Sequence, residues 1–195
     1  LSHKLVRLRA RPKILLATSF EEAEALLERY SPWLMGLISD VEFPRGGQLD
    51  REAGYELARR ARARVNDLPI LLQSSRAEFA AGAAEVGATF LRKYSDTLLA
   101  DLAKFVNTHC GFGDFVFRMP DGHEVARAAN LAELEDRLRT VDPLSIEYHG
   151  QRNHFSMWFR ARTEFALAAK LRPRRVAEFE SLETLRHDLV ESIAE

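Results

Sequence analysis

Short apolar runs alternate with amphipathic stretches through the first half of the chain. Four runs have the length and composition of buried strands, at 13–17, 34–40, 68–73 and 88–93. Apolar residues recur at helical spacing between and after them, which predicts helices over 19–29, 53–65, 77–86 and 97–106. Strands that alternate with helices in this way predict a parallel sheet covered on both faces.

Individual residues indicate where several of these elements begin and end. Ser19 and Glu22 have the spacing of a capping box, which opens the first of the four helices. Gly87 ends the third helix. The glycine-containing stretch 43–48 is expected to be a loop, and residues 1–10 are expected to form a short amphipathic helix.

The pattern changes after residue 110 to that of a small α+β module. Apolar and polar residues alternate over 115–128 on both sides of Pro-Asp-Gly (120–122), which predicts a β-hairpin. Two domains are therefore expected, 1–110 and 111–195.

Helices are predicted to fill the rest of this module. Helix starts are indicated at Asn130, at Asp142-Pro143 and at Ser181. A long aromatic helix is expected over 152–171, ended by the Arg-Pro-Arg-Arg segment at 172–175.

Composition and charge restrict the function classes. The 195 residues are 46% hydrophobic and 29% charged, with a formal net charge of -1, so no overall field attracts nucleic acid or an anionic membrane. No apolar run approaches the ~20 residues of a membrane-spanning helix. Cys110 is the one cysteine, which excludes an internal disulfide and favours a cytoplasmic location; we expect it to be a small structural residue.

Three polar residues follow apolar runs of the expected sheet. These are Asp40, Ser74 and Lys93. Parallel sheets bind ligands at the carboxyl ends of their strands, so the three side chains are expected to converge at one edge. An aspartate can accept a phosphoryl group as a nucleophile, and a lysine and a hydroxyl can stabilise the charge on phosphoryl oxygens.

The motifs around these residues resemble the receiver domains of two-component response regulators. They read SDVEFP (39–44), LPILLQSS (68–75) and GATFLRK (87–93). The resemblance implies a flavodoxin-like fold, with Asp40 as the phosphoacceptor and Ser74 as the switch hydroxyl. It also implies that Lys93 is the phosphate-contacting lysine and that Phe90 is the aromatic residue that changes rotamer on activation.

The chain departs from the receiver pattern at three places. The loop after Pro44 is lengthened by RGGQLDRE (45–52), and Tyr94 stands where receivers usually carry a proline. Receivers also begin with a strand that ends in an acidic pair, which holds Mg²⁺, and we expect that strand to lie upstream of residue 1. The receiver-type sheet would then lack its first strand, and Asp40 alone would bind Mg²⁺ weakly.

A wider resemblance covers nearly the whole chain. RARPKILLATSFEEA, GLISDVEFPRGGQLD, FGDFVFRMPDG and RNHFSMWFRARTEF are similar to the regulatory region of bacterial phosphoenolpyruvate-synthase-like proteins. This implies a regulatory fragment of a larger phosphotransfer protein, not an enzyme by itself, since the sequence has no glycine-rich phosphate loop. The expected partners are a histidine kinase or further domains of the same protein, and a homodimer stays open; neither nucleic acid nor a membrane is expected.

Other residues have a structural interpretation beside a functional one. Glu42 is expected in an exposed loop, with metal binding as the alternative, and His149 and His154 are expected in structural or exposed roles. His123 is expected to face solvent beside the hairpin turn. An aromatic stripe is expected to pack in a core, and to dock against the first domain or a second subunit because a small module could not cover it; it comprises Phe155, Trp158, Phe159 and Phe165.

Two further alternatives stay open. The basic residues near the stripe are expected on a solvated face and linker, with a nucleotide or acidic-partner patch as the alternative; they are Arg160, Arg162, Lys170, Arg172, Arg174 and Arg175. The whole first domain could also be a pseudo-receiver, that is, a constitutive scaffold or dimerisation unit without phosphochemistry.

Overall fold

The computed structural model describes residues 13–171 and 176–194. The chain divides into two compact units, residues 1–105 and 106–195, and the division falls within helix α5 (Leu98–His109). The boundary expected after residue 110 lies just beyond the end of this helix. The helix expected over 1–10 and the break at 172–175 lie outside the described residues.

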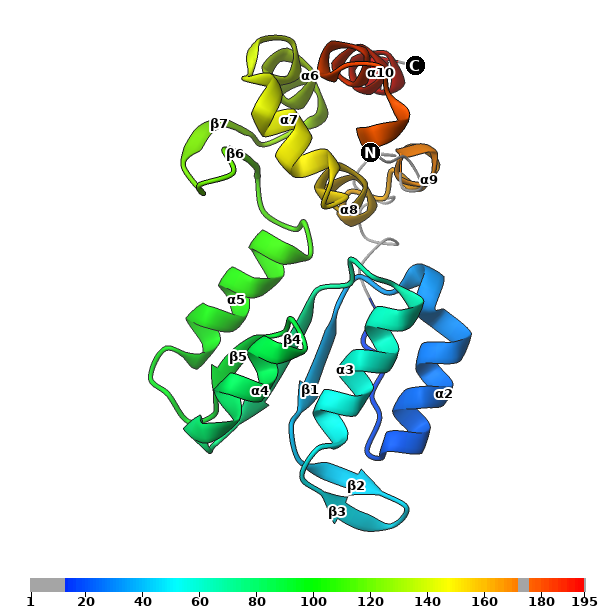
Figure 1. Cartoon of the computed structure of the whole chain (residues 1–195), viewed down its shortest axis with the longest axis vertical. Helices are drawn as coiled ribbons and strands as arrows, with labels where there is room; N and C mark the ends of the chain where they lie inside the picture. Colours follow the sequence, from blue (N-terminus) through cyan, green and yellow to red (C-terminus); the bar gives the residue numbers. More distant parts are fainter. Residues whose placement is uncertain (1–12, 172–175, 195) are drawn as a thin grey trace, which may run out of the picture. The chain divides into compact units, whose positions relative to one another are not determined.

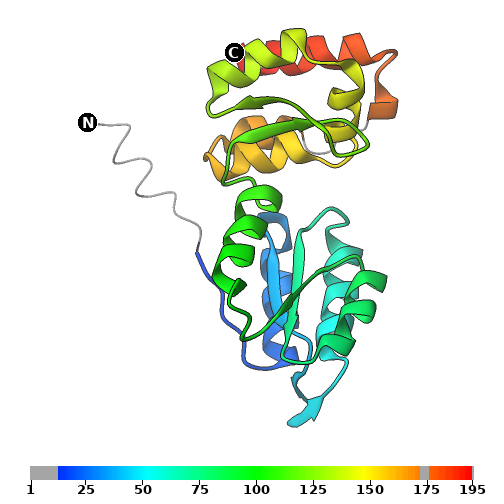
Figure 2. The same cartoon turned by 90° about the vertical axis from the view of Figure 1, so that its left-hand side faces the viewer.

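Unit 1 is an α/β unit around a three-stranded parallel sheet in the order β1-β4-β5 (Figure 1). Its elements in chain order are α2 (Phe20–Tyr30), η1 (Ser31–Trp33), β1 (Leu37–Asp40), β2 (Phe43–Arg45), β3 (Gln48–Asp50), α3 (Ala53–Arg64), β4 (Ile70–Ser74), η2 (Ala77–Phe79), α4 (Ala80–Glu85), β5 (Thr89–Arg92) and the first part of α5. Figure 2 shows α5 on one face of the sheet and α3 and α4 on the other.

The core of unit 1 lies between the central strand and the helices. Leu71 and Leu72 of β4 are fully buried, and Leu57 of α3 packs in the same unit. Helix α2 begins at Ser19, whose hydroxyl accepts a hydrogen bond from the Glu22 backbone N–H, as the capping pattern predicts. The buried strands therefore fix the positions of the loops at their carboxyl ends.

Two predictions for unit 1 are wrong. Residues 13–17 form no strand, and Ile14 is 91% exposed, because the sheet ends at β1 and no described strand pairs with this segment. The expected loop at 43–48 is instead part of the β2–β3 hairpin. Gly46 and Gly47 both adopt positive φ, as a tight two-residue hairpin turn requires.

Unit 2 contains an antiparallel hairpin and helices around an aromatic core. Its elements are the end of α5, β6 (Phe115–Arg118), β7 (Glu124–Ala128), α6 (Leu131–Thr140), α7 (Pro143–Gly150), α8 (His154–Ala161), α9 (Phe165–Leu171), η3 (Val176–Glu178) and α10 (Leu182–Ala194). Helices α6 and α7 each begin after a capping side chain. Asn130 accepts the backbone N–H of Glu133 at the start of α6, and Asp142 accepts that of Leu144 at the start of α7.

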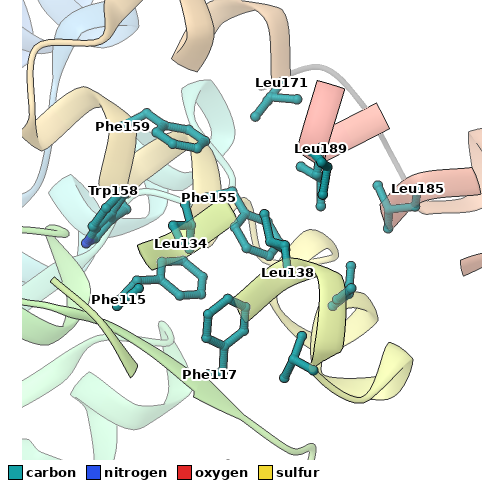
Figure 3. Close-up of a cluster of buried hydrophobic side chains, with 14 of the residues drawn as sticks. Phe115, Phe117, Leu134, Leu138, Phe155, Trp158, Phe159, Leu171, Leu185 and Leu189 are labelled. Atoms are coloured by element: carbon teal, nitrogen blue, oxygen red, sulfur yellow. The ribbon is translucent and has the colours of Figure 1, made fainter. Parts of the chain in front are cut away.

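The aromatic stripe is distributed differently from its expected arrangement. The single helix expected over 152–171 is two helices, separated at Thr163, which adopts a left-handed φ of 67°. Phe155, Trp158 and Phe159 are buried in the core of unit 2 together with side chains of β6, α6 and α10 (Figure 3).

The expected docking of this stripe on another surface is therefore wrong for its three buried members. They are covered within unit 2 itself, because the hairpin and α10 close the core around them. Phe165, the fourth member, is 55% exposed. In the part of the chain that the structure describes, no helix is long and apolar enough to cross a membrane.

Candidate functional site

The carboxyl ends of the three parallel strands bring the candidate residues to one edge of unit 1. Asp40 ends β1 and lies in register with Gln73 of β4. Ser74 ends β4, and Lys93 follows the last residue of β5. The backbone N–H of Lys93 donates a hydrogen bond to the carbonyl oxygen of Ser74, with 2.9 Å between the nitrogen and the oxygen. Parallel direction and short loops therefore place Asp40, Ser74 and Lys93 at the same end of the sheet.

The carboxylate of Asp40 is bound by two donors of this chain. Lys93 Nζ lies 2.7 Å from Oδ2, and Gln73 Nε2 lies 2.9 Å from Oδ1. The Asp40 and Lys93 side chains are 38% and 29% exposed, so water screens the ion pair and limits its contribution to stability to about 1 kcal/mol. The pair is therefore accessible from solvent and contributes little to folding.

Ser74 and Phe90 lie nearby in different environments. Ser74 is buried, and its hydroxyl oxygen accepts a hydrogen bond from the backbone N–H of Arg76 at 3.2 Å. Phe90 is half-buried; it lies beside Leu72 in the sheet and packs against the core of unit 1. Its ring therefore belongs to the packing of unit 1, two register positions before Ser74 on the neighbouring strand.

A second charged cluster lies next to Asp40 and includes residues that the sequence reasoning missed. Glu42 is paired with Arg76 at 3.3 Å and with Arg51 at 3.9 Å, and Arg76 also pairs with Glu78. The Arg76 guanidinium lies over the ring of Phe79, 4.8 Å from its centroid. Glu42 is therefore not simply an exposed loop residue: it anchors the loop after β1 to the loop after β4.

The donor set around Asp40 does not fit a magnesium site. Mg²⁺ takes oxygen ligands, chiefly carboxylates and water. Both Asp40 oxygens already accept hydrogen bonds, and the Glu42 carboxylate is neutralised by two arginines. The described residues hold no cluster of three or more side chains suited to a metal ion.

Close backbone contact fixes the loop that follows Asp40. The Gly54 N–H donates to the Val41 carbonyl oxygen at 2.8 Å, and Val41 is fully buried. A Cβ at position 54 would lie 2.3 Å from the Asp40 carbonyl oxygen, so only glycine fits there. On the other side of the site, Tyr94 follows Lys93 with a left-handed φ of 63° and an exposed side chain.

The histidines of unit 2 form a separate buried group. His149 Nε2 accepts the backbone N–H of Arg118 at 2.8 Å, so its Nδ1 carries the proton and donates to His154 Nδ1 at 2.9 Å. Burial lowers the pKa of His149 to about 3, and the charges of His154, Arg118 and Arg152 add to the effect. A histidine held neutral between aromatic rings has a packing role.

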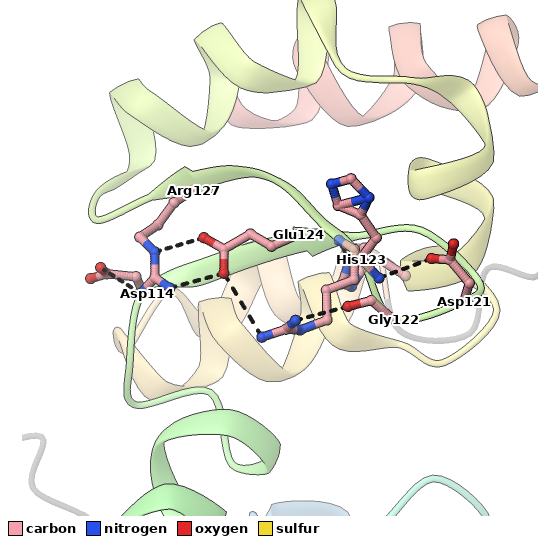
Figure 4. Close-up of polar contacts among 8 residues, drawn as sticks. Asp114, Asp121, Gly122, His123, Glu124 and Arg127 are labelled. Carbon is pink, nitrogen blue, oxygen red and sulfur yellow. Dashed lines mark hydrogen bonds and ion pairs between the residues drawn. The ribbon is translucent and has the colours of Figure 1, made fainter.

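The β6–β7 hairpin carries a charged surface (Figure 4). Arg127 donates to the Glu124 carboxylate and lies 3.4 Å from Asp114, and the hydrogen bond to Glu124 is the main reason that the pKa of Arg127 is raised. His123 is exposed at the turn, where its backbone N–H donates to Asp121. This network pairs its charges internally.

Arg162 and Cys110 are structural groups of unit 2. The Arg162 guanidinium donates to the carbonyl oxygens of Gly111 and Gly113 and lies 3.4 Å from the centroid of the Trp158 ring. Burial lowers its pKa to about 10, so the prediction of a solvated face is wrong for this residue. Cys110 is buried and its thiol pKa is raised to about 11 by that burial, which excludes a thiolate nucleophile at neutral pH.

Gln73 and Arg76 are the site residues that the sequence reasoning did not find. Gln73 had a usable signal, because it is a polar residue directly after the apolar positions 70–72 of β4 and before Ser74. Arg76 had no such signal, because a basic residue in the loop after a strand is common and does not by itself indicate a site. Comparison of the chain with family models, with curated proteins and with solved structures finds no match.

Proposed function

We propose that unit 1 is a receiver-like regulatory domain of signal transduction, with Asp40 as its phosphoacceptor. The observation that carries this proposal is the pairing of Asp40 with Lys93 at the carboxyl ends of parallel strands, 2.7 Å apart. A half-exposed carboxylate next to a lysine is a suitable nucleophile, because the cation offsets the charge that accumulates when a phosphate donor approaches.

The other site residues have roles in the same proposal. The Ser74 hydroxyl oxygen accepts a hydrogen bond from the Arg76 backbone N–H, and its own O–H could donate to a phosphoryl oxygen on Asp40. Movement of Ser74 would leave room for Phe90 to repack, which shifts the population between two arrangements of unit 1. The surface around β5 and α5 would report the change to a partner.

The proposed setting is a larger phosphotransfer protein. The resemblance of the sequence to the regulatory region of phosphoenolpyruvate-synthase-like proteins supports it. In this setting a histidine kinase, or further domains of the same protein, would be the partner of unit 1.

The pseudo-receiver alternative is favoured by one observation. Both oxygens of Asp40 accept hydrogen bonds, and the Glu42 carboxylate, two residues along the chain, is paired with Arg76 and Arg51. A site of this kind could serve only as a structural ion pair, and unit 1 would then be a constitutive scaffold or dimerisation unit.

Phosphorylation of the 195-residue chain distinguishes the two functions. The chain is incubated with acetyl phosphate and Mg²⁺ and then weighed by intact-protein mass spectrometry. We expect slow, substoichiometric addition of one phosphoryl group, lost in Asp40→Asn and retained in Asp136→Asn, a control in unit 2. Stoichiometric labelling would show that the acidic pair is dispensable, and a chain that stays unlabelled would favour the scaffold.

A further inference from the structure

The resting state of Asp40 is determined by the residue next to it in the sheet. Asp40 and Gln73 are register partners in the parallel pair β1–β4, so their side chains leave the same face of the sheet. The amide must present its nitrogen to the carboxylate, because two oxygens would repel each other. The resulting 2.9 Å bond occupies Oδ1, while Lys93 occupies Oδ2.

A carboxylate bound on both oxygens is held in one orientation. Each bond is a charge-assisted hydrogen bond, which is stronger than a bond between neutral groups. Each hydrogen bond uses one lone pair of its oxygen and lowers the nucleophilicity of that oxygen, and a second lone pair stays open. Lys93 carries the positive charge that the incoming phosphate needs, so Gln73 is the donor whose release would make Asp40 more reactive without losing that charge.

We propose that Gln73 is a positioning residue that restrains Asp40 and slows its phosphorylation. The inference rests on the proposed function and adds a means of regulating the same site. It assigns Oδ1 as the attacking oxygen and makes separation of the Gln73 amide from Asp40 a step that accelerates the reaction. Any partner that draws the Gln73 side chain away would thereby activate Asp40.

The step is a simple displacement. With acetyl phosphate as the donor, Asp40 Oδ1 forms a bond to phosphorus while the bond from phosphorus to the bridging oxygen of the donor breaks. The electron pair of that bond leaves with acetate, and the product is an aspartyl phosphate. Lys93 stays beside Oδ2 and the new phosphoryl oxygens throughout, and no oxidant or proton donor is needed.

The variant Gln73→Met tests the inference, because methionine has a similar length but no donor. We expect Gln73→Met to accelerate Asp40 labelling by acetyl phosphate about tenfold, which corresponds to ~1.4 kcal/mol of barrier. Gln48→Met, on the exposed β2–β3 hairpin, is the matched control and should label at the wild-type rate. The double variant Asp40→Asn/Gln73→Met should not label, which assigns the reaction to Asp40.

The outcomes separate this inference from the proposed function. Faster labelling of Gln73→Met supports the inference, including the case in which the wild-type chain stays at background. Equal or slower labelling of a folded Gln73→Met, with Asp40-dependent labelling of the wild type, overturns the inference and leaves the proposed function standing. No Asp40-dependent labelling in either chain overturns both. Thermal unfolding of each variant shows whether it is folded.

Discussion

The two units of this chain cover their apolar side chains to different degrees. In unit 2 the large aromatic residues are enclosed: Trp158 is 2% exposed, and Phe117 and Phe159 are fully buried. In unit 1 the sheet ends at β1, where Ile38 is 48% exposed, and the apolar segment before α2 is largely solvent-exposed. Substitutions in unit 2 should therefore affect folding, and those at the strand ends of unit 1 should affect chemistry.

The polar groups of the two units also differ in their exposure to solvent. The Asp40–Lys93 pair of unit 1 is partly exposed to solvent. His149 of unit 2 is buried, and this burial keeps it neutral by lowering its pKa; each of its ring nitrogens makes one hydrogen bond. A hydrated ion pair can exchange partners at little energetic cost, whereas a buried neutral histidine resists any change of charge. On the proposed function, reactivity would belong to the first kind of site, and the second stabilises the fold of unit 2.

The largest expected effect is the loss of Trp158. Its ring fills the core of unit 2, its Nε1 donates to the Gly113 carbonyl oxygen at 3.0 Å, and Arg162 stacks on it. We expect Trp158→Ala to lower the free energy of unfolding of unit 2 by about 3–5 kcal/mol. Hydrogen–deuterium exchange of unit 2 peptides across a urea series measures the change in the full chain.

The matched control for this variant is Phe165→Ala. Phe165 belongs to the same aromatic stripe but is 55% exposed, so its removal should cost less than about 1 kcal/mol. Equal effects of the two substitutions would contradict the distinction between a covered and an uncovered aromatic residue in unit 2. Light scattering at matched concentration checks that neither variant changes the oligomeric state.

A smaller effect is expected from acidification. The pKa of His149 is about 3 in the folded chain, below its ordinary value of 6.5, because burial disfavours the charged form. Below pH 6.5 the unfolded chain therefore binds a proton that the folded chain does not. The contribution of neutral His149 to the stability of unit 2 is complete above pH 6.5 and falls as the pH drops toward 3. Between pH 6.5 and 5 we expect unit 2 to lose about 2 kcal/mol.

Two variants isolate the contribution of His149. His149→Gln keeps an acceptor for the Arg118 N–H and should remove most of this pH dependence. His187→Gln, on the exposed side of α10, should leave it unchanged. Urea unfolding at pH 6.5, 5.8 and 5, which are roughly even steps over this pH range, gives the slope of the free energy of unfolding against pH for each chain. A slope that survives in His149→Gln would assign the effect to other groups.

Much of the candidate site was predictable because it depends on local rules. Parallel strands end at one edge, so Asp40, Ser74 and Lys93 were recognisable as polar residues after apolar runs. The contact between Gln73 and Asp40 could not be predicted, because it depends on the register of β1 against β4, which no local pattern specifies. The partners of Glu42 likewise depend on two loops that are distant in sequence.

The errors in the fold have the same origin. The apolar run at 13–17 has strand composition, but a strand also needs a hydrogen-bonding neighbour, and composition does not supply one. The stripe over 152–171 has helical spacing on both sides of Thr163, so periodicity could not reveal the left-handed residue that separates α8 from α9. The hairpin at Gly46-Gly47 could have been predicted from its turn chemistry.

The smallest expected effect tests the open side of unit 1. Ile14 is 91% exposed, so in this chain its side chain contributes almost nothing to a packed core. We expect Ile14→Ser to change the free energy of unfolding of unit 1 by less than about 0.5 kcal/mol. Ile70→Ser, the comparison on β4, removes a buried apolar side chain and places a hydroxyl in the core, so it should cost several-fold more. Urea unfolding followed by exchange in unit 1 peptides measures both. A loss of 1 kcal/mol or more in Ile14→Ser would mean that residues 13–17 pack against the sheet after all, and the contrast between an open unit 1 and a closed unit 2 would have to be given up.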